Sequence, residues 1–269
     1  MNGAGGLAMN ALPEIRVRSG NDNYDQSAPA ENPLSRKEQE QLRDIAKIVD
    51  CKAGTTLYSQ GEQAKYVYLI AEGIVRINHC DETGHRQILV FRVQGDFCGI
   101  PYNGDYFNFA ETVSNTVVYR FEWHQIQQIL LTEPHLQSVL LGKILHDYRQ
   151  AQVRISILGQ QNTCQRLASF LLDFIQFPQF FDVERSCLTL PVNRFDLADY
   201  LGTAPESTAR AFAKLENFGL IRRITARKIE ILDRAGLRLL NLTPRRRNSG
   251  HDSDKGSFQD NPELVRHVQ

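Results

Sequence analysis

Apolar side chains recur at helical spacing on either side of Gly202, and this pattern is the clearest in the chain. Before the glycine they stand at Leu197, Ala198 and Leu201. Asn193 precedes them as a favourable N-cap residue, with an acid three positions later. Gly202 can adopt the left-handed conformation that ends helices. The pattern therefore predicts a short helix from about residue 193 to a turn at Gly202.

The segment after Gly202 has the pattern of a second helix. Thr203 and Glu206 have the spacing of a capping box. Pro205 falls in the first helical turn, where its missing N–H costs little. The residues expected to pack inward are Ala209, Phe212, Ala213 and Leu215. Two short helices joined by a tight turn, with the second ended by Gly219, indicate a helix-turn-helix.

A hairpin is predicted directly after this pair of helices. The runs 220–224 and 228–232 are rich in isoleucine and leucine, as strands are, and they flank Thr225-Ala226-Arg227. Arginines and lysines stand around the tip of the hairpin. A basic hairpin after a helix-turn-helix predicts a wing beside a DNA-binding helix.

The outer face of the second helix carries the chemistry that DNA recognition requires. We interpret Glu206, Ser207 and Arg210 as base-reading residues, because Arg210 can donate to guanine O6 and N7 while Glu206 accepts from cytosine N4. The residues expected to contact phosphates are Thr203, Lys214, Arg222, Arg227 and Lys228, with Ser207 as a further contact. The alternative is that Glu206 and Arg210 only form an i,i+4 pair, which stabilises a helix by a few tenths of a kcal/mol.

The N-terminal half of the chain has the pattern of short strands. A helix is predicted from Leu34 to Val49, with Ser35 as its N-cap and Glu38 in capping-box position. Short β elements follow at 54–58, 60–62, 66–70, 73–77, 86–91, 95–99 and 116–121. Glycines, including Gly61 and Gly73, separate them where turns need positive φ. Phe177 to Arg185 is expected to be a loop, and Ala235 to Leu242 a closing helix.

A heptad pattern lies between these two parts. After Pro134, apolar residues step by three and four positions at Leu141, Ile144, Tyr148, Ala151, Ile155 and Leu158. This spacing is typical of a seam between two helices, so we expect a homodimer. The alternative is a helix that covers its own strands, because Val139, Leu140 and Leu145 widen the apolar stripe; both roles can hold together.

These patterns predict an α+β protein with five segments. We expect disordered tails at 1–33 and 243–269, a sensor-like β domain at 34–121, a dimerisation helix at 122–159, and a winged helix-turn-helix at 160–242. The chain of 269 residues is long enough for two domains. Its formal net charge is zero, so DNA affinity has to come from a local basic patch.

The composition and motifs indicate the cellular compartment and whether the protein is an enzyme. The five cysteines are Cys51, Cys80, Cys98, Cys164 and Cys187, and their odd number and scattered spacing indicate free thiols in the cytoplasm. No apolar run reaches the roughly 18 residues of a membrane span, and no signal-peptide pattern is evident. No Ser/His/Asp, paired-carboxylate or phosphate-loop signature appears, so we expect no enzymatic activity.

The chain resembles the Crp/Fnr family of bacterial transcription regulators from about Leu34 to Asp233. The resemblance rests on Glu206 and Arg210 and on the residues around them, Asp196-Leu197-Ala198, Gly202, Leu215 and Gly219-Leu220-Ile221, with the wing and the glycine-divided strands. It implies a cyclic-nucleotide-binding-like β-roll followed by a dimerisation helix and a winged helix-turn-helix. It also implies double-stranded DNA and RNA polymerase as partners and a near-palindromic site whose half contains a TGA-like core. Activation and repression stay open.

The resemblance is closer to the Fnr and FixK branches than to the cyclic-AMP-binding branch. Phe109 stands where binding members have the arginine that pairs with the cyclic phosphate. The N-terminal tail lacks the cysteines with which some Fnr-type relatives hold an iron–sulfur cluster. We therefore expect no cofactor and no cyclic AMP.

A sensor of the same fold, using haem, a nucleotide or cysteine oxidation, is the alternative function. Cys98 stands where a carbon-monoxide-sensing haem relative has a cysteine ligand, but Ile100 replaces that relative's histidine, and a structural thiol is the alternative. Cys187 could act as a redox switch near DNA, or it could be an ordinary strand residue. The hairpin from His79 to His85 holds metal-ligand residue types, but its sequence is also ordinary turn chemistry, so no metal is expected.

Overall fold

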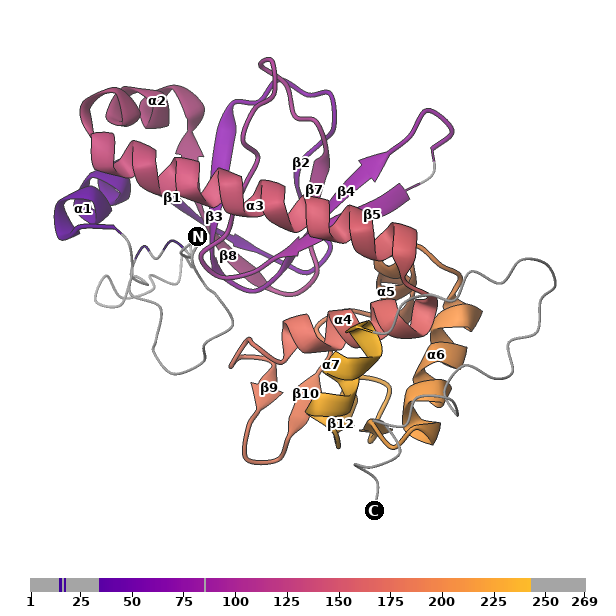
Figure 1. The fold of residues 1–269 in the computed structure, drawn as a ribbon. Coiled ribbons are helices and arrows are strands. Elements are labelled where there is room, and N and C mark those ends of the chain that lie inside the picture. The colour runs from indigo at the N-terminus through magenta and orange to yellow at the C-terminus, as the bar shows by residue number, and fades with distance from the viewer. Residues whose placement is uncertain (1–14, 16, 18–33, 85, 243–269) are drawn as a thin grey trace, which may run out of the picture. The chain divides into compact units, whose positions relative to one another are not determined.

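The computed structural model describes residues 15, 17, 34–84 and 86–242 (Figure 1). The chain divides into two compact units, Met1–Tyr148 and Arg149–Gln269, and each is described by itself. The long helix α3 (Pro134–Gln160) contributes residues to both units. In the predicted N-terminal tail only Ile15 and Val17 are described, and residues 243–269 lie outside the described part altogether.

The first unit is a β-roll of two antiparallel four-stranded sheets, with orders β1-β8-β3-β6 and β2-β7-β4-β5. Its strands are β1 (Lys47–Cys51), β2 (Thr56–Tyr58), β3 (Tyr66–Glu72), β4 (Val75–Cys80), β5 (Arg86–Arg92), β6 (Phe97–Cys98), β7 (Phe109–Thr112) and β8 (Thr116–Glu122). The predicted β element at 60–62 is a turn in the structure, where Gly61 has φ +81°. The α+β fold class with a β-roll is confirmed.

The interior of the roll is filled by aromatic side chains. The ring of Tyr58 stacks on Tyr106 at 4.2 Å between centroids and on Tyr68 at 5.9 Å. The hydroxyl of Tyr58 accepts a hydrogen bond from the Gly99 N–H at 3.1 Å, so this buried polar group is satisfied. Cys98 belongs to the same buried cluster. The roll therefore has a packed core between its sheets.

A second core lies between the sheet that contains β3 and β8 and three helices. The helices are α1 (Arg36–Ile45), α2 (Trp123–Thr132) and the first half of α3. Buried members of this core are Leu42, Leu69, Phe121, Ile126 and Leu136, together with Ile15 and Val17. Disorder was predicted for residues 1–33; at Ile15 and Val17 that prediction is wrong, because burial of both side chains holds them against the fold.

The predicted helix from Leu34 to Val49 extends four residues too far at its C-terminal end. Its start is correct, since Ser35 and Glu38 form a reciprocal capping box. Its end is wrong, because α1 stops at Ile45 and Lys47–Cys51 pairs with β8, with Lys47 opposite Arg120. Backbone hydrogen bonds to a distant strand thus override a local apolar spacing that suits a helix.

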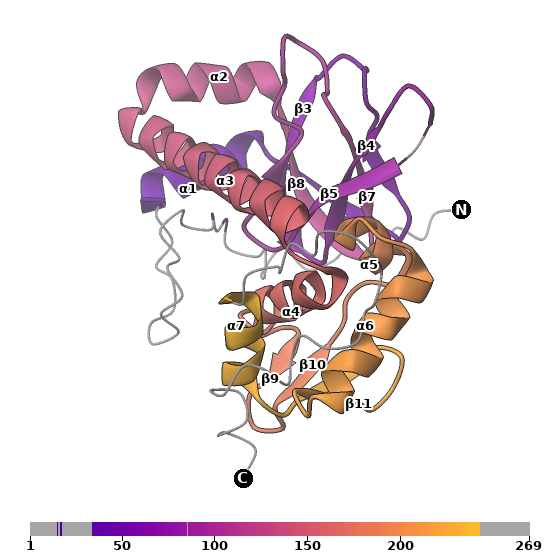
Figure 2. The ribbon, with the colours of Figure 1, turned by 45° about the vertical axis from the view of Figure 1, so that its right-hand side comes forward.

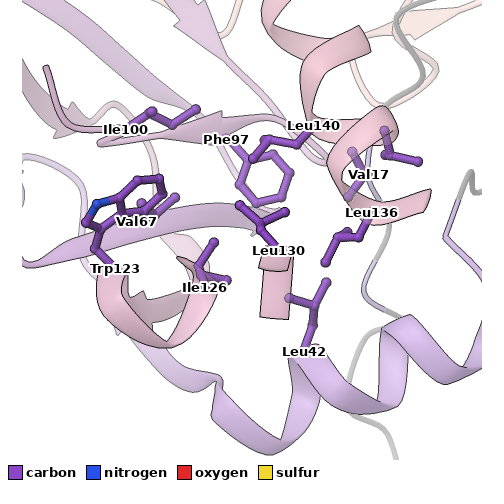
Figure 3. A pocket seen from close by; sticks show the side chains of 11 residues that line it. Val17, Leu42, Val67, Phe97, Ile100, Trp123, Ile126, Leu130, Leu136 and Leu140 are labelled. Atoms are coloured by element: carbon purple, nitrogen blue, oxygen red, sulfur yellow. The ribbon is translucent and has the colours of Figure 1, made fainter. Parts of the chain in front are cut away.

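A small hollow opens within the second core, and the described side chains that line it are all apolar (Figure 3). Phe97, Trp123, Ile126 and Leu136 point toward it from β6, α2 and α3, and Val17 closes one side. The space within reach of a water-sized molecule measures about 20 Å³. Among the described residues, no charged side chain lines this hollow.

The second unit contains the helix-turn-helix and its wing. Its elements are α4 (Thr163–Phe174), β9 (Phe181–Asp182), β10 (Cys187–Thr189), α5 (Arg194–Leu201), α6 (Pro205–Asn217), β11 (Ile221–Arg223), β12 (Lys228–Ile231) and α7 (Arg234–Leu242). The strands form one sheet in the order β11-β12-β10-β9. The predicted loop from Phe177 to Arg185 contains β9, which pairs with β10, so that prediction is wrong in part. The wing and the closing helix are confirmed.

Candidate nucleic-acid interface

The first helix of the motif begins and ends as the sequence predicts. The Asn193 side-chain oxygen accepts hydrogen bonds from the N–H groups of Phe195 and Asp196, both at 2.9 Å. Its amide group donates to the Asp196 carboxylate at 2.8 Å. Gly202 ends α5 with φ +62° and ψ +46°. These caps satisfy backbone groups at both ends of a helix only eight residues long.

The start of α6 differs from the prediction. Ala204, not Thr203, is the N-cap residue, and no side chain hydrogen-bonds to the cap. Pro205 occupies the first helical turn, as expected. The capping box of Thr203 and Glu206 is therefore wrong. Because Glu206 is not used to cap its own helix, its exposed carboxylate is available to an external donor.

The buried face of α6 consists of Thr208, Ala211, Phe212 and Leu215. Burial of Phe212 and Leu215 was predicted, but Ala209 and Ala213 are exposed, so their predicted inward packing is wrong. Thr208 can be buried because its hydroxyl donates to the Ala204 carbonyl at 3.3 Å. Alanine was the misleading residue, since it is small enough for either face.

Helix α6 is labelled in Figure 2. Its outer face carries the predicted base-reading group and two alanine methyls. Glu206 and Arg210 are exposed, and Ser207 and Lys214 are half-buried. The Arg210 guanidinium donates to the Ser207 hydroxyl at 2.9 Å. This bond ties the exposed Arg210 side chain to a residue one helical turn earlier.

The wing carries two kinds of cation: arginines paired with carboxylates along its strands, and exposed cations at its tip. Arg222 Nε donates to Glu230 across the hairpin at 2.7 Å. Arg223 donates to Glu216 of α6 at 2.9 Å through both its backbone N–H and its Nε, and these side-chain and backbone hydrogen bonds lower the pKa of Glu216. Arg227 and Lys228 stand at the exposed tip. Arg222, a predicted phosphate contact, is thus already engaged by a carboxylate.

The heptad positions on α3 form an exposed apolar series. Leu141 is 57% exposed, Ile144 42%, Tyr148 62% and Ile155 70%. Ala151 is also exposed, and Leu158 is half-buried. The opposite face of α3 is covered, since Leu136 and Lys143 are buried. Helix α3 therefore has one buried face and one exposed apolar face.

A buried ion pair joins α3 to the loop just before β6. Lys143 of α3 donates to Asp96 at 2.7 Å, and each side chain is only 3% exposed. The other carboxylate oxygen of Asp96 accepts from the Val93 N–H at 3.0 Å. Phe109, at the position of the phosphate-binding arginine, is a half-buried residue of β7 opposite Asn78. A phenylalanine at this position offers no charged partner for a nucleotide phosphate.

The cysteines differ in exposure. Cys98 is 6% exposed, and burial raises the pKa of its thiol to about 12. Cys187 is half-buried on β10, opposite Glu230 of the wing. Within the described ranges, no group of three His, Cys, Asp or Glu side chains is placed to hold a metal ion. His85, one of the hairpin residues considered for a metal, lies outside them.

Comparison with known proteins agrees with this architecture. Residues 165–240 match the family model described as a Crp-like helix-turn-helix domain, and residues 48–133 match the cyclic nucleotide-binding domain. The nitrogen fixation regulation protein FixK of Rhizobium meliloti (strain 1021) is 31% identical over 197 residues, which cover 72% of this chain and 86% of that protein. The protein of the same name from Bradyrhizobium diazoefficiens is 27% identical over 207 residues, 77% of this chain and 87% of its own.

A solved structure is similar over the same region. It is that of FixK2 from Bradyrhizobium japonicum, with a TM-score of 0.66 and 26% identity over 73% of this chain and 98% of that one. Among the described residues, none of the helices combines the length and the apolar character needed to cross a membrane.

Proposed function

The chain belongs to the Crp/Fnr family, is nearer to its FixK and Fnr branches, and is a DNA-binding transcription regulator; from this premise we propose that it binds a near-palindromic site as a homodimer through α6. The observation that carries the proposal is the outer face of α6. There an arginine, a carboxylate, a hydroxyl and two methyl groups lie on one solvent-facing surface. A helix in the major groove needs such groups.

Arg210 and Glu206 read a G·C base pair in this proposal. Arg210 donates two hydrogen bonds to guanine, and Glu206 accepts one from a cytosine amino group. The bond from Arg210 to Ser207 supports this role, because it orders the arginine before DNA arrives and lowers the entropy lost on binding. Ser207 itself is placed to reach a base edge or a neighbouring phosphate.

Ala209 and Ala213 add a role that the sequence pattern did not predict. Because these exposed side chains are small, the outer face of α6 can approach the base edges in the groove closely. An alanine methyl can also contact the methyl group of thymine. We therefore assign Ala209, next to Arg210, to recognition of a thymine in the half-site.

Phosphate contacts hold the helix in register. Lys214, Arg227 and Lys228 are the cations proposed for this role, and Thr203 contributes from the turn before α6. Arg222 can join them only by leaving Glu230, so its contribution is expected to be smaller. A chain without net charge then relies on these local cations for its salt-dependent affinity.

The exposed apolar series on α3 supports a twofold dimer. Four large apolar side chains that are 42–70% exposed and spaced as in a heptad are typical of a helix seam. Two copies of α6 related by a twofold axis would contact half-sites about one DNA turn apart, and the target is then a near-palindrome.

We extend the proposal to the cellular setting. RNA polymerase is the second macromolecular partner of a regulator that activates, and access to the chromosome places the protein in the cytoplasm. The similar proteins are named as regulators, which supports a role without enzymatic activity. In this proposal cyclic AMP is not required, because Phe109 offers no cation to pair with its phosphate.

The test is the DNA preference of Arg210→Ala. Wild-type protein should prefer a selected palindrome over random duplex, and the variant should lose about 1–3 kcal/mol of that discrimination per half-site while keeping salt-sensitive non-specific binding. Arg185→Ala is the matched control, since Arg185 is exposed and lies outside the proposed interface. A variant that keeps the full preference for the palindrome contradicts the role of Arg210.

A further inference from the structure

One side chain, Arg166 of α4, joins the last turn of α3 to the turn of the helix-turn-helix. Its Nη2 donates to the Leu158 carbonyl at 2.7 Å, and its Nε donates to the Gln161 carbonyl at 3.0 Å. On the other side, its Nη1 donates to the Leu201 carbonyl at 2.9 Å and reaches the Gly202 carbonyl at 3.4 Å. All these residues belong to the second unit.

The chemistry of this contact explains why an arginine stands there. Leu158 is in the last turn of α3, and Leu201 is the last residue of α5. Carbonyls at a helix C-terminus have no partner within their own helix, and they carry the negative end of the helix dipole. A guanidinium supplies a planar, permanently charged set of donors that can serve two such ends at once.

Two further contacts hold the same pair of helices together. The Arg154 guanidinium of α3 lies 3.8 Å above the ring of Tyr200 in α5. A Leu158 methyl lies 3.4 Å from the point that a Cβ on Gly202 would occupy. The end of α3 is therefore held against α5 and the turn by three contacts. Of these, only the contact through Arg166 consists of hydrogen bonds.

We infer that Arg166 is a positioning residue that sets the distance between the two recognition helices of the dimer, and so the half-site spacing that the protein accepts. This inference rests on the proposed function. Three of the predicted seam residues, Ala151, Ile155 and Leu158, lie on the stretch of α3 that Arg166 grips. A chain of contacts therefore links the dimer seam to the base-reading face: the seam residues of α3, then Arg166, then the turn and α6.

A fixed spacing has a measurable consequence in DNA. One added base pair moves a half-site by about 3.4 Å and rotates it by about 35°. A rigid dimer has to deform the DNA to bind such a site, whereas a dimer with a loosened turn can follow it. Spacing preference thus reports on Arg166, while base preference within a half-site reports on Arg210.

The experiment compares palindromes that differ only in the spacer, shortened or lengthened by one base pair. Wild-type protein should prefer the best spacer by about tenfold or more. Arg166→Met keeps the apolar stem but removes every donor, and it should reduce this preference to within about threefold with base choice inside the half-site unchanged. Arg185→Met is the control and should behave as wild type, and sedimentation should show that each protein is a dimer.

Each outcome decides one question. An Arg166→Met protein that folds and keeps the full spacing preference overturns the inference. If that variant does not fold, Arg166→Lys replaces it, since its single nitrogen can restore the charge but cannot serve both helix ends; a wild-type spacing preference in Arg166→Lys then overturns the inference. If wild-type protein shows no base preference on any spacer, the proposed function itself fails.

Discussion

At the scale of single residues, burial divides the five cysteines into two groups. Cys51, Cys98 and Cys164 are buried, while Cys80 and Cys187 are half-buried. Since burial raises the pKa of Cys98 to about 12, its thiolate is scarcely populated at pH 8. The thiolate is the reactive form, so Cys98 should be inert in the folded protein.

Iodoacetamide labelling at pH 8 tests this division. Mass spectrometry of the native protein should find Cys187 and Cys80 modified and Cys98 unmodified, and labelling in urea should modify all five. Modification of Cys98 at the same rate as Cys187 would contradict the structural role assigned to Cys98. Cys187 then remains the candidate for an oxidative switch, because it lies on β10 directly opposite Glu230 of the wing.

The pair of Glu216 and Arg223 links α6 to the wing and gives a pH-dependent contribution. Hydrogen bonds from Arg223 lower the pKa of Glu216 in the folded state. A lowered folded-state pKa gives stability that is present above the unfolded value of 4.5 and is lost as the pH falls through the folded value. Water screens the pair, so the contribution should not exceed about 1 kcal/mol.

Glu216→Gln should therefore be less stable than wild type at pH 7 and should lose less stability between pH 5 and pH 3. Urea unfolding at several pH values measures the difference. The control is Glu184→Gln, since Glu184 is exposed and takes no part in the pair of Glu216 and Arg223. Parallel losses of stability with pH in wild type and Glu216→Gln would show that this pair does not titrate as described.

At the scale of elements, two glycines with positive φ differ in the space around them. Substituting each one therefore distinguishes the conformational from the steric cost of a side chain. Gly61 and Gly73 both have positive φ, at +81° and +92°. A Cβ on Gly61 would meet nothing within 4 Å, whereas one on Gly73 would lie 2.5 Å from Thr116 Oγ1 and 2.6 Å from the Asn115 carbonyl oxygen. The connection between β2 and β3 therefore has room for a side chain at Gly61, and the turn between β3 and β4 has none at Gly73.

Gly61→Ala should cost about 1–2 kcal/mol, the conformational term alone. Gly73→Ala should cost clearly more, because the added atom overlaps a backbone oxygen that cannot move freely. Urea unfolding of the two variants makes the comparison, with Gly61→Ala as the matched control. Equal losses in the two variants would mean that the β-roll can shift at Asn115 without cost.

Local signals explain which elements the sequence predicted. The caps at Asn193 and Gly202 and the wing depend on the residues that form them, and these predictions were correct. Lys47–Cys51 was missed as a strand because its partner, β8, lies far away in the chain. Ala209 was placed on the wrong face because an alanine carries almost no information about burial. The ion pair of Lys143 and Asp96 and the grip of Arg166 depend on tertiary contacts that no spacing rule describes.

At the scale of the whole molecule, dimerisation through α3 should control DNA affinity. The predicted seam residues Tyr148 and Ile155 are 62% and 70% exposed in the single chain. A charge at either position would have to be buried against a second helix, where it lacks a partner. Tyr148→Glu and Ile155→Lys should therefore shift the protein toward monomer.

Val153 provides the matched control, because it is 47% exposed on the same helix but is not one of the six heptad positions. Val153→Lys should stay a dimer and bind the palindrome as wild type does. Ile155→Lys should sediment as a monomer and lose about 100-fold or more in affinity for the palindrome, because the two half-sites are no longer bound by one linked molecule. Its affinity for a single half-site should change little, since α6 and its partners lie outside the substitution. If Ile155→Lys remains a dimer while Val153→Lys dissociates, the seam lies on a different face of α3, and the spacing argument for Arg166 must be rebuilt from that face.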